Sequence, residues 1–160
     1  MAKKDEKTNV MRVLELKGID YKGYTYDPEP DLSGDEVARL LGEDPDRVFK
    51  TLVTTNGKNQ YFVFLVPVCQ ELHLKKAAKA VGEKSIEMVK SKELLGLTGY
   101  IHGGCSPIGM KKQFGTVFDA SCLEQETILV SAGKIGAQVE TAPQNLIDIT
   151  RGSTADLTID

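Results

Sequence analysis

Two stretches rich in β-branched and aromatic residues stand on either side of Asn56-Gly57 and cover residues 48–55 and 61–66. Asn-Gly between such runs is a strong mark of a β-hairpin, although the connection here can exceed two residues. The second run, Tyr-Phe-Val-Phe-Leu-Val, is apolar at every position, as in a strand buried on both faces. The sequence therefore predicts a sheet in which this run is a central strand.

The rest of the chain mixes helix and strand signals without a regular βαβ alternation. Ser33 and Glu36 have the spacing of a capping box before a short helix that Gly42 ends. The prolines of residues 27–31 indicate a loop, and Asp44-Pro45 starts another turn. Helices are expected over residues 8–17, 74–81, 91–95 (with Ser91 as the cap) and 143–149, and strands over 21–26, 86–89, 115–119, 127–131 and 137–141. We predict an α/β fold of the α+β type.

Composition limits the class of protein. The 160 residues are enough for a single domain, expected to span residues 1–160, and 41% hydrophobic with 27% charged residues is typical of a soluble globular protein. We expect no membrane span and no signal peptide, because no run of about 18 apolar residues occurs and no apolar segment follows the charged N-terminus. The three cysteines, Cys69, Cys105 and Cys122, form neither a disulfide framework nor a zinc pattern. These features indicate a cytoplasmic protein.

The charge is unevenly distributed. A net charge of −3 argues against tight nucleic-acid binding by the chain alone. Lysines nevertheless concentrate at positions 75, 76, 79, 84, 90 and 92, and Lys111-Lys112 follow. They form either a local basic face or a solvated helix face.

A glycine-rich loop, Gly-Gly-Cys-Ser-Pro-Ile-Gly, covers residues 103–109 between apolar runs. Glycine permits positive φ and close approach of the backbone, and proline fixes φ. Such a loop is either a tight structural turn or a pocket wall whose N–H groups bind a carbonyl, carboxylate or phosphate.

Lys50 lies inside the strand predicted over residues 48–55. The period of two places it on one face with Val48 and Leu52. A lysine there either extends its ammonium group to water or directs it to an acceptor in a pocket.

Other catalytic classes fit poorly. His73 and His102 lack metal-ligand spacing, and the chain has no P-loop, dinucleotide fingerprint or Gly-x-Ser-x-Gly elbow. A dyad of Cys105 with His102 is conceivable, but a free cysteine more often packs as a small buried hydrophobe. The residues alone thus predict a polar pocket that suits a small molecule or an aminoacyl ester.

Five segments in order carry a resemblance to a known family. They are Tyr26-Asp27, residues 48–53 (VFKTLV), residues 74–79 (LKKAAK), residues 99–109 (GYIHGGCSPIG) and residues 130–134 (VSAGK). Over nearly the whole chain, this set resembles the YbaK/EbsC family of aminoacyl-tRNA editing proteins, which is similar to the editing domain of bacterial prolyl-tRNA synthetases. The resemblance implies a mixed, largely antiparallel, curved sheet with flanking helices.

The resemblance also implies an enzyme, a trans-editing hydrolase that deacylates mischarged Cys-tRNA(Pro). A pocket that admits proline cannot strongly exclude an amino acid of similar size, which is why hydrolytic editing exists. The substrate's own thiol would attack its ester and leave a thiolactone. Neither a protein nucleophile nor a cofactor nor a metal is implied.

Site residues follow from the same resemblance. Lys50 would hold the terminal nucleotide or its phosphate, and Gly103 with neighbouring amides would engage the ester carbonyl as an oxyanion site. The substrate-binding residues would be Tyr26, Thr51, Gly104, Ser106 and Ser131.

Two positions depart from the family pattern and bear on specificity. Ser33 stands where relatives often carry a large aromatic residue, and Gln138 where an acidic residue is common. The chain also lacks the histidine motif of the alanine-clearing branch, which favours cysteine. The alternatives are a deacylase for another mischarged tRNA, such as Ala-tRNA, and a non-catalytic regulator that binds aminoacyl-tRNA or a small molecule.

The expected partners are tRNA(Pro) mischarged with cysteine and prolyl-tRNA synthetase. Because the chain is acidic, a transient synthetase–tRNA complex would deliver the substrate. Either a monomer or a weak dimer is compatible with the sequence.

Overall fold

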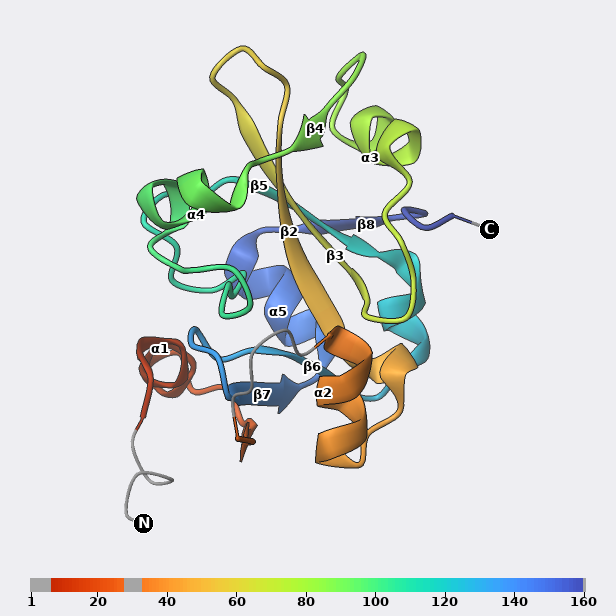
Figure 1. Ribbon diagram of the computed structural model, residues 1–160. Coiled ribbons are helices and arrows are strands. Elements are labelled where there is room, and N and C mark those ends of the chain that lie inside the picture. Colours follow the sequence, from red (N-terminus) through yellow and green to blue (C-terminus); the bar gives the residue numbers. More distant parts are fainter. Residues whose placement is uncertain (1–6, 28–32, 160) are drawn as a thin grey trace.

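The computed structural model describes residues 7–27 and 33–159. Its larger sheet contains β2 (Phe49–Thr55), β3 (Tyr61–Pro67), β4 (Glu87–Met88), β5 (Gly115–Asp119) and β8 (Ser153–Ala155). Their spatial order is β4-β2-β3-β5-β8 (Figure 1). The β2–β3 hairpin is antiparallel, with Lys50 opposite Val66, and β3 is the middle strand. The predicted hairpin and its central strand are confirmed.

A second sheet contains β1 (Lys22–Thr25), β6 (Ile128–Ser131) and β7 (Ala137–Thr141), with β7 in the middle. An isolated bridge from Val48 to Leu129 joins this sheet to the start of β2. Most strand pairs are antiparallel, and β3–β5 and β5–β8 are parallel. The predicted fold class is confirmed, in the form of two sheets linked at one bridge.

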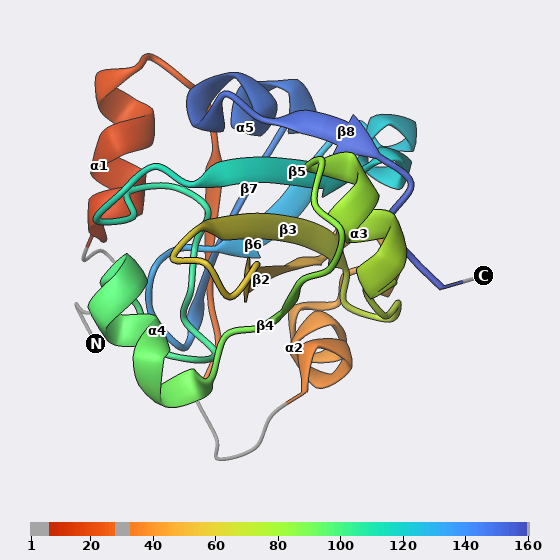
Figure 2. The ribbon, with the colours of Figure 1, turned by 90° about the horizontal axis from the view of Figure 1, so that it is seen from above.

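Helices flank the sheets on both sides. They are α1 (Asn9–Leu16), α2 (Gly34–Leu41), α3 (Leu74–Ala80), α4 (Ser91–Thr98) and α5 (Pro143–Thr150), with short 3₁₀ helices η2 (Pro45–Arg47) and η3 (Ala120–Glu124). Seen from above, α2 and α4 lie on the β2 side of the larger sheet and α5 on the far side (Figure 2). No described helix is long and apolar enough to cross a membrane. Neither β8 nor η3 was predicted.

The capping signals have mixed outcomes. The box before α2 is confirmed, because Ser33 Oγ accepts from the Glu36 N–H at 3.2 Å and Glu36 Oε1 accepts from the Ser33 N–H at 2.9 Å. The prediction for Ser91 was wrong: Lys90 is the cap residue of α4, with no side-chain cap bond. This helix also continues to Thr98, whose hydroxyl donates to the Leu94 carbonyl at 2.8 Å and is buried. The loop predicted over residues 27–31 falls mostly outside the described residues.

The hydrophobic core is divided by the β2–β3 hairpin. On one side, Phe49 and Val53 belong to the largest cluster, which also includes Cys105. On the other side, Leu52 packs against a cluster that α3 covers with Ala77 and Ala78. Alternate residues of β2 therefore face different layers of the molecule.

Candidate functional site

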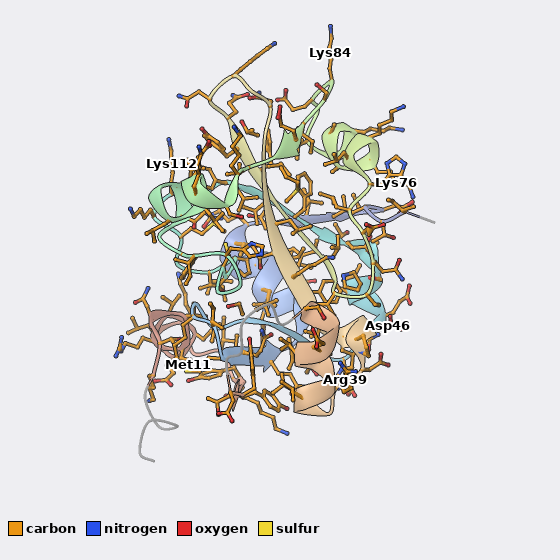
Figure 3. The ribbon with its side chains drawn as sticks, in the orientation of Figure 1. Met11, Arg39, Asp46, Lys76, Lys84 and Lys112 are labelled. Carbon is orange, nitrogen blue, oxygen red and sulfur yellow. The ribbon has the colours of Figure 1, made fainter. Side chains whose placement is uncertain are left out.

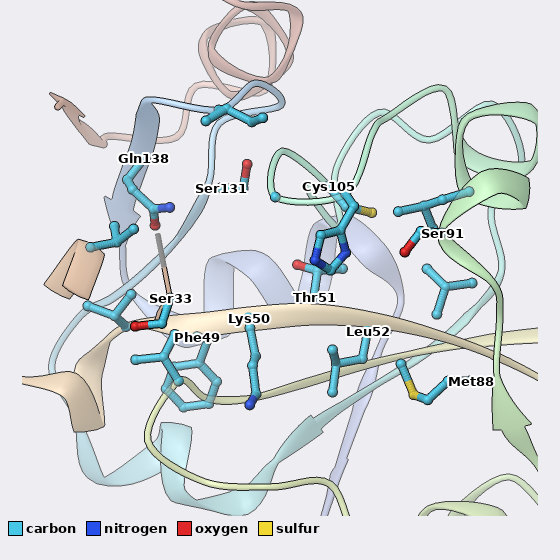
Figure 4. A pocket seen from close by; sticks show the side chains of 18 of the residues that line it. Ser33, Phe49, Lys50, Thr51, Leu52, Met88, Ser91, Cys105, Ser131 and Gln138 are labelled. Carbon is cyan, nitrogen blue, oxygen red and sulfur yellow. The ribbon is translucent and has the colours of Figure 1, made fainter. Parts of the chain in front are cut away.

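A cavity of about 730 Å³ lies beside β2. Its other walls come from the start of α2, the connection from β4 to α4, the glycine loop, and the facing ends of β6 and β7 (Figure 4). The polar and sulfur-bearing residues of its lining are Tyr26, Ser33, Lys50, Thr51, Met88, Ser91, His102, Cys105, Ser131 and Gln138. Most of the predicted site residues are therefore brought to one cavity from distant parts of the chain.

Lys50 and Thr51 reach this cavity from opposite faces of β2. Thr51 shares its face with Phe49 and Val53, which pack in the cluster that contains Cys105. The Lys50 side chain extends from the other face, on the side of Leu52 and away from Ser131 and Cys105 (Figure 4). The two predicted residues can thus contact different parts of one ligand.

Gly103 presents an exposed backbone to the cavity. It adopts φ +89°, a conformation that L side chains rarely adopt. The N–H groups of Gly103 and Cys105 have no hydrogen-bond partner among the described residues. Both residues line the cavity, so their amides are placed to bind an oxyanion.

Gly104 and Ser106, predicted to bind substrate, do not line the cavity. The Gly104 N–H donates to the Ile101 carbonyl at 3.0 Å, and a Cβ on Gly104 would lie 2.9 Å from the backbone nitrogen of Ile135. Ser106 is fully buried, and its Oγ accepts from the Ile108 N–H at 3.3 Å. Gly104 thus packs the loop against the segment that joins β6 to β7, and Ser106 braces the loop from within.

The far wall carries Ser131 and Gln138, which stand opposite each other in the β6–β7 register. Ser131 Oγ accepts from the Gly133 N–H at 3.2 Å, which fixes the turn. Gln138 is buried, and its Oε1 has no hydrogen-bond partner among the described residues; the same holds for the buried Thr51 Oγ1. Buried polar atoms are usually hydrogen-bonded, so these two unpaired oxygens are candidate contacts for a ligand. The sequence identified Gln138 only as a departure from a family pattern.

A polar network holds the strand that carries Gln138. Arg47 pairs with Glu43 at 2.8 Å and also with Glu140 and Thr127, and Tyr24 donates to Glu140. Burial opposes ionisation of Glu140, but hydrogen bonds from Thr127, Tyr24 and Arg47 outweigh it and lower the pKa of this carboxyl group. The network ties η2 to β1, to β7 and to Thr127, the residue before β6.

The thiol of Cys105 is a poor nucleophile. Its side chain is 6% exposed, and burial raises its pKa to about 11. Only the thiolate attacks, so very little of the reactive form is present at neutral pH. The arrangement supports the packing role for Cys105 and argues against a dyad with His102, which lies exposed at the cavity wall.

The described lining residues include no carboxylate; their charged or titratable members are Lys50, Tyr26, His102 and Cys105. Among the residues that the structure describes, no group of His, Cys, Asp or Glu could hold a metal ion. The site therefore offers one cation, backbone amides and neutral acceptors to a ligand.

Three of the clustered lysines lie on separate parts of the surface. Lys84 lies at the tip of the loop before β4, Lys112 lies beside α4, and Lys76 lies near the C-terminus (Figure 3). Lys76 also pairs with Asp156 at 3.0 Å. These three lysines therefore do not share a single basic patch.

Residues 29–149 match the family described as the aminoacyl-tRNA editing domain. The chain belongs to this family. This editing domain is 48% identical to EbsC of Enterococcus faecalis, which is named as a Cys-tRNA(Pro)/Cys-tRNA(Cys) deacylase. The alignment covers 99% of this chain and 98% of EbsC. It is also 30% identical to the proline–tRNA ligase of Trichlorobacter lovleyi. That alignment covers 62% of this chain and 17% of the ligase.

A solved structure agrees with the sequence relatives. The editing domain matches the crystal structure of a protein described as a trans-editing enzyme for prolyl-tRNA synthetase, with a TM-score of 0.81 and 25% identity. The match covers 97% of this chain and 99% of that one. The resemblance to the YbaK/EbsC family is confirmed.

Proposed function

We propose that this chain is a trans-acting aminoacyl-tRNA deacylase that hydrolyses Cys-tRNA(Pro). The observation that carries the proposal is the cavity beside β2, in which Thr51 Oγ1 and Gln138 Oε1 are buried acceptors and Gly103 presents an open backbone. An aminoacyl ester has matching parts: N–H and O–H donors on its amino group and ribose, and a carbonyl oxygen. Full-length similarity to EbsC supports cysteine and tRNA(Pro) as the substrate's components.

The chemistry proposed for this cavity uses the substrate's thiol. Its sulfur attacks the ester carbonyl, a C–S bond forms, the C–O bond to the ribose breaks, and the thiol proton passes to the ribose oxygen. Water then opens the thiolactone to free cysteine. Because the thiol and the carbonyl belong to one residue, proximity supplies much of the acceleration.

The protein's part in this reaction is positioning and electrostatic stabilisation. The N–H groups of Gly103 and Cys105 would donate to the oxygen that gains charge during the attack. Lys50, on the other face of β2, would hold the phosphate of the terminal nucleotide. Tyr26 and Ser131 would shape the wall around the amino acid.

The partner follows from the same proposal. A chain of net charge −3 with dispersed lysines would bind tRNA weakly. We therefore propose that prolyl-tRNA synthetase transiently presents the mischarged tRNA, which fits the similarity of this domain to part of proline–tRNA ligases.

A deacylation panel tests the function. The purified protein is incubated with Cys-, Ala-, Ser- and Pro-tRNA(Pro), and loss of the ester is followed over time. We expect Cys-tRNA(Pro) to be cleaved fastest, and an amine that reacts with thioesters to trap the thiolactone. Equal cleavage of Ala-tRNA(Pro) would replace the thiol mechanism with water attack, and no cleavage of any substrate would favour a binding role.

A further inference from the structure

The outer edge of β2 is open at Thr51. The Val68 N–H donates to the Val48 carbonyl at 2.8 Å, so the main-chain groups of Val48 point toward β3. Hydrogen-bonded pairs recur at every second residue of an antiparallel ladder, so the main-chain groups of Lys50 and Leu52 also point toward β3. The main-chain groups of Thr51 and Val53 therefore point away from β3. Val53 shows this directly, since its carbonyl accepts from the Val89 N–H at 3.0 Å.

The edge is covered on either side of Thr51. At one end, β4 pairs with Thr54 and Thr55 and its last bond reaches Val53. At the other end, Val48 is bridged to Leu129 of β6. Between them, Thr51 pairs with no residue on the side away from β3 in the described part of the chain.

The cavity lies where β4 would have continued. Extending the register that pairs Thr54 with Met88 would place Ser91 opposite Thr51. At Ser91 the chain turns instead into α4, and Ser91 becomes part of the cavity wall. Because β4 stops before the position opposite Thr51, a space the size of one strand residue remains beside Thr51.

We infer that the aminoacyl group of the substrate fills this space as a single strand residue; the inference rests on the proposed function and deepens it. Two residues in a hydrogen-bonded antiparallel pair exchange both N–H···O=C bonds. An aminoacyl ester has the same two groups, so its amino group donates to the Thr51 carbonyl and its ester carbonyl accepts from the Thr51 N–H. The N–H groups of Thr51 and Gly103 then both donate to the ester oxygen as it gains negative charge.

This pairing orients the rest of the substrate. Directly opposed residues of an antiparallel pair project their side chains from the same face. An L-aminoacyl side chain therefore lies beside Thr51 Oγ1, on the face of Cys105 and Ser131, and the ribose is directed toward Phe49 and away from Ser91. A D-aminoacyl group would project from the Lys50 face or lose one of the two bonds.

The test uses stable substrate analogues. Adenosine carrying L-cysteine or D-cysteine through an amide in place of the ester is titrated into the ¹⁵N-labelled protein, and amide hydrogen exchange is measured residue by residue. With the L-analogue bound, the Thr51 N–H is expected to exchange about tenfold more slowly, while the Leu52 N–H, which faces β3, remains unchanged. The L-analogue is expected to bind about tenfold or more tightly than the D-analogue.

Thr51→Val is the matched variant, because it keeps the main chain and the β-branched shape and removes only the hydroxyl group. Protection of residue 51 by the L-analogue should persist in this variant. Binding of the L-analogue without slower exchange at Thr51, or equal binding of both analogues, would overturn the pairing and leave the proposed function intact. Failure of both analogues to bind would overturn the pairing together with the aminoacyl site.

Discussion

A Cβ placed on Gly104 would lie 2.9 Å from the backbone nitrogen of Ile135. The glycine loop and the turn between β6 and β7 thus meet backbone to backbone, and this contact fixes where Gly103 and Ser131 border the cavity.

Replacement of Gly104 should therefore cost stability. In Gly104→Ala the backbone of Ile135 must move, and overpacking of this kind lowers the free energy of unfolding by about 1–3 kcal/mol. Urea unfolding measures the change. Gly96→Ala is the control: this helical glycine has open space around its Cβ position, so alanine should be neutral or slightly stabilising. Equal stability of the Gly104 variant and the wild type would show that the two loops separate easily.

Lys50→Ala is expected to reduce deacylation without unfolding the protein. A charge-assisted hydrogen bond to a phosphate or carbonyl contributes about 1.5–3 kcal/mol, so kcat/KM should fall about 10–150-fold. Lys58→Ala, at the exposed hairpin connection, should retain full activity. Near-normal turnover by a folded Lys50→Ala protein would remove Lys50 from the mechanism.

Gln138→Met should separate stability from activity. The Oε1 of Gln138 is buried and has no described partner, so its replacement by an apolar side chain of similar size should leave stability unchanged or raise it. Substrate binding should weaken, because a donor of the substrate loses its acceptor. Thermal unfolding and steady-state kinetics test the two effects; lower stability with unchanged KM would identify Gln138 as structural.

The cysteines should differ in reactivity. Burial raises the pKa of Cys105 and of Cys122 to about 11, whereas Cys69 is exposed. Iodoacetamide at neutral pH should therefore modify Cys69 first, as measured by mass spectrometry of peptides. Cys105→Ala should keep most of the deacylase activity. Loss of activity in that variant, with the fold intact, would make Cys105 part of the chemistry.

Glu140 should stabilise the fold in a pH-dependent way. Its pKa is lowered in the folded protein, so its contribution is present above the ordinary carboxyl pKa of 4.5 and is lost as the pH falls through the folded value. Glu140→Gln should lower the free energy of unfolding by about 1.5–3 kcal/mol near neutral pH, and this difference should shrink in acid. Glu15→Gln, which removes an exposed pair with Lys7, should have little effect at either pH.

Local patterns were enough to predict much of the fold. The hairpin follows from two β-rich runs around Asn56-Gly57, and the start of α2 follows from Ser33 and Glu36, because each signal acts between residues close in sequence. Elements without such a signal were missed. The strand β8 consists of Ser-Thr-Ala and exists through its pairing with β5, from Val117 opposite Ser153 onward.

The sequence by itself determined which residues could bear the chemistry: Lys50 in a strand, a loop rich in glycine, and segments that resemble an editing family. Only the tertiary structure decided which of them share a cavity. It turned Ser106 inward, packed Gly104 on Ile135, placed Lys50 and Thr51 on opposite faces of β2, and brought Gln138 to the far wall. The physical reason is that these contacts join residues far apart in the chain, and backbone packing and strand register set them rather than any local preference.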